Sequence, residues 1–350
     1  MRRNNFDLLR LYLAFIVVLG HLCVLSDVAV FKKFLPYFNT YISVTGFFCI
    51  SGFLITRSFV TTTSVPLYFK KRAARLLPAY ILVIVLSSVL LYFVSTYNAA
   101  GYFSNPAFFK YLISNLFFLN FLAPCLPGVF MSNPLACWVN PALWTLKVEV
   151  LFYLIVPLLI YVLDKSKHKF VVIIIIYLLS ILYRNILLHA GSNSLEILSR
   201  QLPGFMSYFS CGIALFYYFE YFKKNKNSLL ILALILFFAE KYSPYEIVTP
   251  LALSIIIFFV AFSFPALNSI IKFGDISYGI YIFHAPIIQT VTHFNLFNRY
   301  NPYLVAVGTI TVIILISLVS WHLIEKKFLD KVRKRPVVLP EELTEIKTIN

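Results

Sequence analysis

Apolar segments separated by short, mostly basic segments run along almost the whole chain of 350 residues. The apolar segments are continuous rather than alternating, which argues against a β-barrel, and most are long enough to cross a hydrocarbon core of about 30 Å as helices. The pattern predicts an all-α, polytopic membrane helical bundle with about ten transmembrane helices. The expected spans cover residues 8–25, 37–59, 68–94, 143–163, 170–188, 203–222, 228–240, 247–264, 276–291 and 304–324.

The apolar run at residues 108–122 is an exception, because about 15 residues are short for a span. We therefore expect a short re-entrant or interfacial segment there. If this run crossed the membrane, the basic segments 164–169 and 223–226 would lie outside. Without that crossing, they lie in the cytoplasm with segment 68–75 and both termini, as the positive-inside rule requires. The predicted location is the bacterial cytoplasmic (inner) membrane, with multiple passes and both termini cytoplasmic.

Composition supports the membrane assignment and excludes other classes of protein. The chain is 60% hydrophobic and only 13% charged, which is too apolar for a soluble fold. Its net charge of +16 does not indicate nucleic-acid binding, because the basic residues lie between spans rather than on a soluble domain. No spacing typical of a metal site is present, so we expect no metal. The N-terminal apolar run resembles a signal peptide, but it is longer than usual and lacks a clear cleavage site, so we expect a retained first span.

The sequence predicts a simple domain organisation. Residues 1–330 are expected to form one membrane domain and residues 331–350 a basic and polar cytoplasmic tail. The segment 95–142 is the largest external feature and our candidate for acceptor selection. It contains Cys125 and Cys137, two of five cysteines, which can form a disulfide if this loop faces an oxidising compartment.

The first expected span carries two polar residues, Arg10 and His21, in an otherwise apolar helix. They are separated by about three helical turns, so both lie on one face, roughly 16 Å apart along the axis. Charged and polar groups inside a span are costly, and two on one face indicate a polar cavity. The alternatives are an arginine that reaches the headgroups from the helix end and a core histidine bonded to a neighbouring carbonyl group.

Glu149 is the expected partner of His21, because the two residues lie at a similar depth. His21 lies about 20 Å from the cytoplasmic edge, and Glu149, on a helix that enters from outside, lies at roughly 21 Å. A carboxylate at that depth can fix the imidazole tautomer and stabilise the imidazolium that forms when histidine acts as a base. We therefore predict a catalytic pair of His21 and Glu149, with a structural buried ion pair as the alternative.

A set of basic residues opens the third expected span at the cytoplasmic surface. Arg72 and Arg75 share a helix face there, and Lys71 adds charge beside them. Arginine is suited to bidentate contacts with phosphate, so a phosphate-binding site is one interpretation. The alternative is ordinary basic charge that contacts anionic lipid headgroups.

The remaining site candidates lie in later spans. Tyr281 and His284 share one face of the ninth expected span, where a polar site and a packed core histidine are equally compatible with the pattern. Arg184 lies near the outer level of its span and either binds an acceptor or extends toward the headgroups. Tyr153, in the span that carries Glu149, is a further candidate.

Several motifs, in this order, resemble those of the acyltransferase-3 family of bacterial integral membrane O-acyltransferases. They are Arg10-x10-His21 after Asp7, Gly46-Phe-Phe-Cys-Ile-Ser-Gly-Phe-Leu-Ile-Thr56, Tyr68-x3-Arg72-x2-Arg75-Leu-x-Pro78, Leu143-Trp-Thr-Leu-x-Val-Glu149-x2-Phe-Tyr153 and Ser277-Tyr-Gly-x-Tyr281-x2-His284-Ala-Pro286. Each motif alone is weak evidence, whereas all of them in order along most of the chain are specific. Lys147 departs from the pattern, since small polar residues are usual at that position.

The resemblance implies transfer of an acyl group, usually acetyl, from cytoplasmic coenzyme A to a hydroxyl group of a glycan or lipid-linked glycan outside. It implies acetyl-CoA, or another acyl-CoA, as a co-substrate and no bound cofactor. Arg72 and Arg75, with Lys71, would contact the nucleotide phosphates, and Arg10 would stand at the mouth of a path to His21. His21 would deprotonate the acceptor hydroxyl, with an acyl-histidine intermediate as the alternative.

A transporter or flippase for a polysaccharide precursor or anionic substrate is the main alternative function, because intramembrane charges also line substrate pathways. Against it, the sequence contains no internal repeat and no pair of interrupted helices in matching halves. A non-enzymatic subunit of polysaccharide assembly is a second alternative. The acceptor, the acyl group and the oligomeric state do not follow from the sequence.

Overall fold

The computed structural model describes residues 4–265 and 274–333. These residues are helical, apart from connecting loops and one isolated β-bridge between Cys125 and Trp138. The long helices are α1 (Phe6–Leu25), α3 (Thr40–Val60), α4 (Val65–Leu90), α7 (Trp144–Lys165), α8 (Lys169–Leu188), α10 (Leu202–Tyr217), α11 (Phe219–Glu240), α12 (Thr249–Ser263), α13 (Ser277–His293) and α15 (Pro302–Ser320). The predicted all-α membrane bundle is confirmed, and each expected span overlaps one of these helices. The boundary between the expected spans 203–222 and 228–240 is wrong, because α11 begins at Phe219 and the basic segment 223–226 lies within it.

Short helices connect the long ones. They are α2 (Ala29–Lys32), α5 (Ala99–Phe103), α6 (Pro106–Leu116), α9 (Asn193–Ser199), α14 (Leu296–Arg299), α16 (Lys326–Arg333), the 3-10 turns η1 (Leu35–Tyr37), η2 (Leu91–Val94), η3 (Asn120–Leu122) and η4 (Pro141–Leu143), and a π-helix, η5 (Trp321–Glu325). The predicted short segment at 108–122 corresponds to α6 and η3, and α6 packs against α4. With 11 residues, α6 is about 16 Å long and too short to span a bilayer.

Not every long helix meets the length expected of a membrane span. By length and composition, the described residues contain six candidate spans, or seven if the segments 193–217 and 219–240, bent by 112°, form one span. α12 has 15 residues and is about 22 Å long, less than a hydrocarbon core of about 30 Å. The chain is therefore a multi-pass membrane protein, but the prediction of ten spans is not confirmed.

α3 packs at the centre of the bundle against α1, α7, α10 and α12. Its contact with α10 is very close, because a Cβ atom on Gly52 or on Gly212 would clash with backbone atoms of the facing helix. Phe152 of α7 stacks on Phe209 of α10, with ring centroids 4.1 Å apart. This packing fixes the face that α3 presents to α1 and α7, where the candidate site lies.

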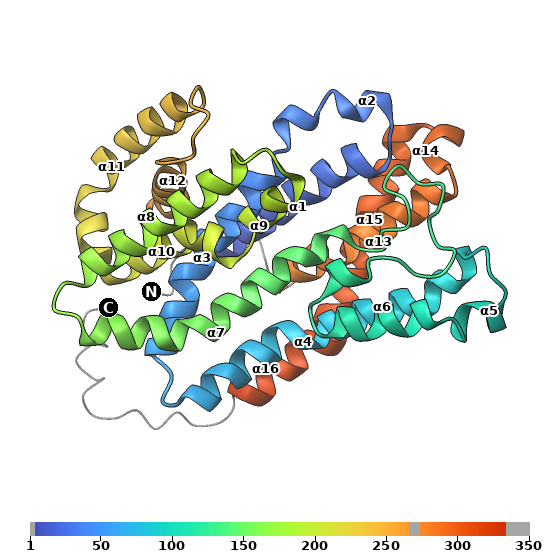
Figure 1. The fold of residues 1–350 in the computed structure, drawn as a ribbon, viewed down its shortest axis with the longest axis horizontal. Coiled ribbons are helices and arrows are strands. Elements are labelled where there is room, and N and C mark those ends of the chain that lie inside the picture. The colour runs from blue at the N-terminus through green and yellow to red at the C-terminus, as the bar shows by residue number, and fades with distance from the viewer. Residues whose placement is uncertain (1–3, 266–273, 334–350) are drawn as a thin grey trace.

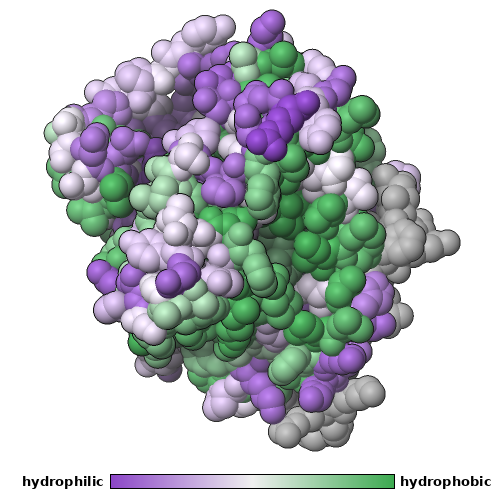
Figure 2. All heavy atoms as spheres, turned by 90° about the vertical axis from the view of Figure 1, so that its right-hand side faces the viewer, coloured by the Kyte–Doolittle hydropathy of each residue, from purple (hydrophilic) through white to green (hydrophobic). Residues whose placement is uncertain are grey.

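The two ends of the bundle differ in structure. α5 and α14 lie at one end, and segment 95–142 folds over this end (Figure 1). Figure 2 looks onto it and shows hydrophobic side chains over much of the centre, with hydrophilic ones toward the upper margin. Residues 334–350, most of the predicted C-terminal tail, lie outside the described residues.

Candidate active site

A large cavity lies among α1, α3, α4, α7 and the connection from α15 to α16, with a volume of about 870 Å³. Its lining is rich in basic residues, namely Arg10, Arg57, Lys71, Arg72 and Arg75. Arg57 lies in the last turn of α3, and the other four come from α1 and the first half of α4. Residues of α1, α3 and α4 therefore direct cations toward one space.

A smaller cavity of about 70 Å³ adjoins the large one, since both are lined by Arg10, Phe47, Ser51, Arg75, Glu149 and Tyr153. Beyond these shared residues, the small cavity is lined mainly by apolar and aromatic side chains, including Val44, Phe48, Leu146 and Tyr281. We call the side of the large cavity formed by Arg57, Lys71 and Arg72 the basic mouth, and the small cavity the narrow end.

Asp275 neutralises two arginines between the mouth and the narrow end. Nη1 of Arg10 and Nη2 of Arg75 donate to its Oδ2 atom at 2.7 Å and 2.6 Å, and Oγ of Ser277 donates to Oδ1 at 2.6 Å. Burial opposes ionisation, but the two guanidinium groups hold the pKa of the Asp275 carboxyl group well below its usual range. Arg10 and Arg75 are thus already paired with a carboxylate.

The basic mouth is not neutralised in this way. Among the described residues, no carboxylate lies within ion-pair distance of Arg57, Lys71 or Arg72. Nζ of Lys71 donates to Oγ1 of Thr62 at 2.9 Å, and Nη2 of Arg72 donates to Oγ of Ser58 at 3.1 Å. Nε of Arg72 is buried without a hydrogen-bond partner in the described structure. These cations are available to bind an anion.

α1 and α13 bring two histidines together. Nδ1 of His21 lies 2.6 Å from Nε2 of His284, and Nδ1 of His284 lies 3.3 Å from the carbonyl oxygen of Ile280. We assign the tautomers from these contacts, since each close pair needs one donor. Nδ1–H of His284 donates to Ile280, and Nδ1–H of His21 donates to Nε2 of His284. This assignment leaves Nε2 of His21 as an unprotonated nitrogen that can accept a proton.

The predicted contact between His21 and Glu149 is wrong in this structure. Oε1 of Glu149 accepts a hydrogen bond from Oη of Tyr153 at 2.5 Å, and no hydrogen bond joins Glu149 to either histidine of the pair. The prediction compared depth along two helices, and depth does not reveal the direction in which a side chain points around its helix axis. His284 occupies the orienting position that we expected for Glu149.

Tyr281 connects the narrow end with the histidine pair. It lines the narrow end, and its Oη atom lies 2.7 Å from Oγ1 of Thr145. Its ring centroid lies 6.0 Å from that of His284, one turn further along α13. The structure therefore places Tyr281 beside both the narrow end and the histidines. This position agrees with the prediction that Tyr281 and His284 lie on one face of their helix.

Arg184 is not brought to this site. Its Nε atom lies 3.2 Å from Oε2 of Glu246, and Tyr41 and Tyr208 donate to the same carboxylate. The Arg184 side chain is 6% exposed and lines neither cavity. Neither alternative given for Arg184 describes this arrangement, since the residue forms a buried ion pair that joins α3, α8, α10 and the α11–α12 connection.

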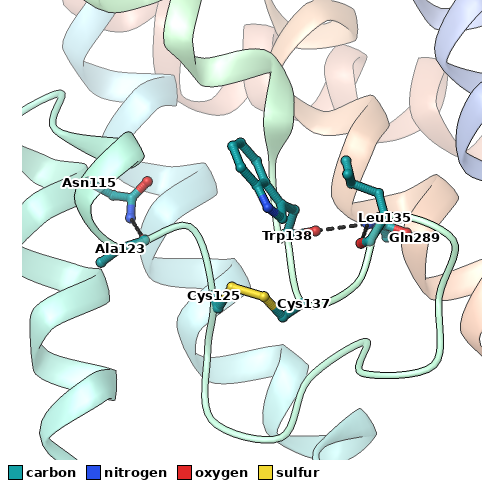
Figure 3. Close-up of a disulfide and its surroundings, with 7 residues drawn as sticks. All are labelled: Asn115, Ala123, Cys125, Leu135, Cys137, Trp138 and Gln289. Carbon is teal, nitrogen blue, oxygen red and sulfur yellow. Dashed lines mark hydrogen bonds between the residues drawn. A yellow bond between two sulfur atoms is a disulfide. The ribbon is translucent and has the colours of Figure 1, made fainter. Parts of the chain in front are cut away.

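A disulfide joins Cys125 to Cys137 in the segment that we expected to face an oxidising compartment (Figure 3). The loop that it closes is attached to α13 through Gln289. Nε2 of Gln289 donates to the carbonyl oxygens of Leu135 at 3.0 Å and Trp138 at 2.9 Å, as Figure 3 shows. The loop therefore packs on the same helix as His284.

Some residues of the site were missed from the sequence. Asp275 lies two residues before Ser277, where the last motif begins, and it is one of only 14 acidic residues in the chain. Its position could therefore have indicated a role at the site. Arg57 looked like one of many basic residues that flank a span. No group of three or more His, Cys, Asp or Glu residues suited to a metal ion occurs in the described part of the chain.

Together the fold and the cavities define an integral membrane protein with a polar cavity whose narrow end is lined by Tyr281, the neighbour of a histidine pair. Neither His21 nor His284 itself lines either cavity. Residues 3–322 match the acyltransferase-3 family, described as an acyltransferase domain. The chain belongs to this family and is a membrane O-acetyltransferase, as its motifs predicted.

Three curated relatives are similar over most of this chain. An O-acetyl transferase of Shigella phage Sf6 is 26% identical over 343 residues, which cover 94% of this chain and 97% of that protein. Nodulation protein 10 of Rhizobium leguminosarum bv. viciae is 25% identical over 93% of this chain and 92% of its own length. Peptidoglycan O-acetyltransferase OatA of Listeria monocytogenes is 28% identical over 81% of this chain but 50% of that protein. No solved structure matches the chain.

Proposed function

We propose that this enzyme transfers an acetyl group from cytoplasmic acetyl-CoA to a hydroxyl group of a cell-surface glycan on the opposite side of the membrane. One observation carries the proposal. Two adjoining cavities lead from the unneutralised cations of the basic mouth to Tyr281, whose ring lies 6.0 Å from that of His284. Their charge at one end and their narrowness at the other match a substrate with phosphates at one end and a small acyl thioester at the other.

The basic mouth is the proposed binding site for the phosphates of coenzyme A. Arg57 and Arg72 supply planar guanidinium groups, which suit phosphate oxygens, and Lys71 adds a point charge. A volume of about 870 Å³ is within the range of cavities that enclose cofactor-sized ligands. The mouth then faces the cytoplasm, where acetyl-CoA is present, and this orientation agrees with cytoplasmic termini in the bacterial inner membrane.

Glu149 and Tyr153 are the proposed contacts of the pantetheine arm. Both line the two cavities, at the position where the arm would pass from the mouth to the narrow end. The arm carries amide N–H groups, which an ionised carboxylate accepts strongly. This role replaces the orientation of His21 that we first assigned to Glu149.

The histidine pair is the proposed base. The acceptor hydroxyl transfers its proton to Nε2 of His21 while its oxygen attacks the thioester carbonyl carbon. The carbon–sulfur bond then breaks, and the coenzyme A thiolate leaves and takes up the proton. His284 holds His21 in the tautomer that can accept the proton, through the chain of hydrogen bonds that ends at Ile280.

A glycan acceptor is supported by the name of one relative, a peptidoglycan O-acetyltransferase, and transfer of acetyl to oxygen also by that of the phage O-acetyl transferase. The acceptor would approach from the end that carries α5 and α14, where segment 95–142 and its disulfide lie (Figure 1). A disulfide in this segment fits an extracytoplasmic surface, because thiols stay reduced in the cytoplasm.

The direct test uses purified enzyme in lipid nanodiscs with acetyl-CoA labelled in the acetyl group, and glycan extracted from cells that lack the enzyme. We expect label to move to the glycan and free coenzyme A to appear in equal amount. The His21→Ala variant, inserted normally, should give neither product. Transfer by His21→Ala at the wild-type rate would overturn the assignment of the base, and absence of acetyl-CoA binding by the wild type would overturn the donor.

A further inference from the structure

The basic residues of the cavity fall into two groups, one without and one with a carboxylate partner. The basic mouth holds Arg57, Lys71 and Arg72, with no carboxylate partner among the described residues. Further in, Arg10 and Arg75 share the carboxylate of Asp275. The charge of the wall therefore falls from strongly positive at the mouth toward zero at the narrow end.

The narrow end has no net positive charge when its ionised neighbours are counted. Arg10 and Arg75 line it and carry two positive charges, Glu149 lines it and carries one negative charge, and Asp275 adds another by direct contact with both arginines. Without Asp275, two guanidinium groups would face the cavity as an open binding site for a carboxylate.

We propose that Asp275 is a specificity-determining residue that restricts the enzyme to acyl groups without a negative charge. The inference rests on the proposed binding of acyl-CoA in this cavity. An acyl group that ends in a carboxylate would meet arginines that are already paired and the like charges of Asp275 and Glu149. A wall without net positive charge does not compensate the cost of removing a carboxylate from water, so it rejects charged acyl groups more than it affects acetyl.

The same arrangement sets the orientation of the donor. Because only the basic mouth carries unneutralised charge, the phosphates of coenzyme A are drawn there and not to Arg10 and Arg75. The neutral thioester is then the end that enters the narrow cavity. Ser277 fixes the orientation of Asp275 by donating a hydrogen bond to its second carboxylate oxygen at 2.6 Å, so that both carboxylate oxygens have partners.

The test compares two acyl-CoA thioesters of almost equal shape and different charge. Malonyl-CoA ends in a carboxylate, and isovaleryl-CoA carries an isopropyl group in its place. Each is titrated as a competitor of acetyl-CoA, so that an inhibition constant is obtained whether or not the thioester is a substrate. The enzymes are the wild type, Asp275→Asn, Asp275→Glu and a control, Asp7→Asn.

Asp7 is a matched control because its Oδ1 atom lies 3.9 Å from Nη1 of the same Arg10, while its side chain is 53% exposed. Asp7 lines the large cavity but not the narrow end, and solvent screens its exposed carboxylate, so its removal changes the field at the narrow end little. We expect the wild type, Asp275→Glu and Asp7→Asn to bind malonyl-CoA more weakly than isovaleryl-CoA. In Asp275→Asn, the ratio of the two inhibition constants should shift toward malonyl-CoA on the order of tenfold.

Three outcomes would overturn the inference while leaving the proposed function intact. One is an unchanged ratio in Asp275→Asn, and another is an equal shift in Asp7→Asn. The third is that the wild type binds malonyl-CoA as tightly as isovaleryl-CoA. This outcome needs no variant, so it can be tested even if Asp275→Asn fails to fold. A wild type that does not bind acetyl-CoA at all would instead overturn the proposed donor site.

Discussion

Nδ1 of His21 lies 2.6 Å from Nε2 of His284, although 263 residues separate the two histidines in the sequence. Their rings stack with centroids 4.9 Å apart and planes inclined by 20°. The contact joins the first helix of the bundle to α13. The sequence had predicted that His21 pairs with a carboxylate. The structure instead pairs it with a second histidine, His284, which fixes the tautomer of His21.

Substitution of His284 should lower the rate of the chemical step without weakening donor binding. We expect His284→Gln to reduce kcat by about 10²–10³-fold, because general base catalysis contributes that order of magnitude. The KM for acetyl-CoA should stay close to the wild-type value. The double variant His21→Ala/His284→Gln should be no worse than His21→Ala alone, since the two rings act as one unit. Steady-state kinetics with His168→Ala, an exposed loop histidine, provide the control.

Loss of a cation from the basic mouth should weaken donor binding. We expect Arg57→Ala and Arg72→Ala each to raise the KM for acetyl-CoA about tenfold, since a hydrogen bond to a charged group contributes about 1.5–3 kcal/mol. The wild-type KM should rise with salt, and the variants should show a shallower salt dependence. Lys223→Ala removes an exposed cation that is paired with Glu220 and lines neither cavity, so its KM should not change.

Arg184 should matter for stability rather than for catalysis. Arg184→Leu leaves Glu246 without its buried cation, and we expect the free energy of unfolding to fall by about 3–5 kcal/mol. The exposed pair of Arg200 and Glu196 gives a matched control, because Arg200→Ala should cost less than about 1 kcal/mol. Denaturation in detergent measures both values. A folded Arg184→Leu enzyme with normal stability and a raised acceptor KM would instead assign this residue to the acceptor.

The disulfide loop should stabilise the part of α13 around Gln289. The loop between Cys125 and Cys137 spans 12 residues, and a crosslink of that length contributes about 3 kcal/mol. We expect the double variant Cys125→Ser/Cys137→Ser to melt at a lower temperature than the wild type, and a reductant to lower the wild-type melting temperature to a similar value. The reductant should leave the double variant unchanged. A reductant effect on the double variant would show that another thiol is responsible.

The ion pairs of Asp275 should stabilise the protein throughout the neutral range. Its pKa in the folded protein lies below the value of about 3.9 for an unfolded chain. The stabilisation is therefore fully present above about pH 4 and is lost only as the pH falls through the folded-state pKa. Asp275→Asn should be less stable than the wild type by the same amount at pH 8 and pH 5. A difference that disappears between these pH values would mean that Asp275 titrates there.

Several features of the site could be predicted from the sequence because they depend on local spacing. Arg10 and His21 lie on one helix at a fixed separation, and Arg72 and Arg75 are one turn apart on another. Tyr281 and His284 share a face for the same reason. Each of these relationships is present in the structure.

The partners across helices could not be predicted in this way. Glu149 and His21 were matched by depth, yet the rotation of α7 about its axis directs Glu149 into the cavities, where its partner is Tyr153 of the same helix. Asp275 lies between segments, where no periodic pattern reveals its contacts with Arg10 and Arg75.

The sequence by itself determined that this chain is a helical membrane protein, where its helices lie and which family it resembles. Those properties depend on hydrophobicity and motif spacing, which residues close in the sequence set among themselves. Only the tertiary structure decided that His21 contacts His284 and which cations of the cavity have no carboxylate partner among the described residues. These depend on how helices pack and rotate against one another, and the contacts that set the rotation join residues far apart in the chain.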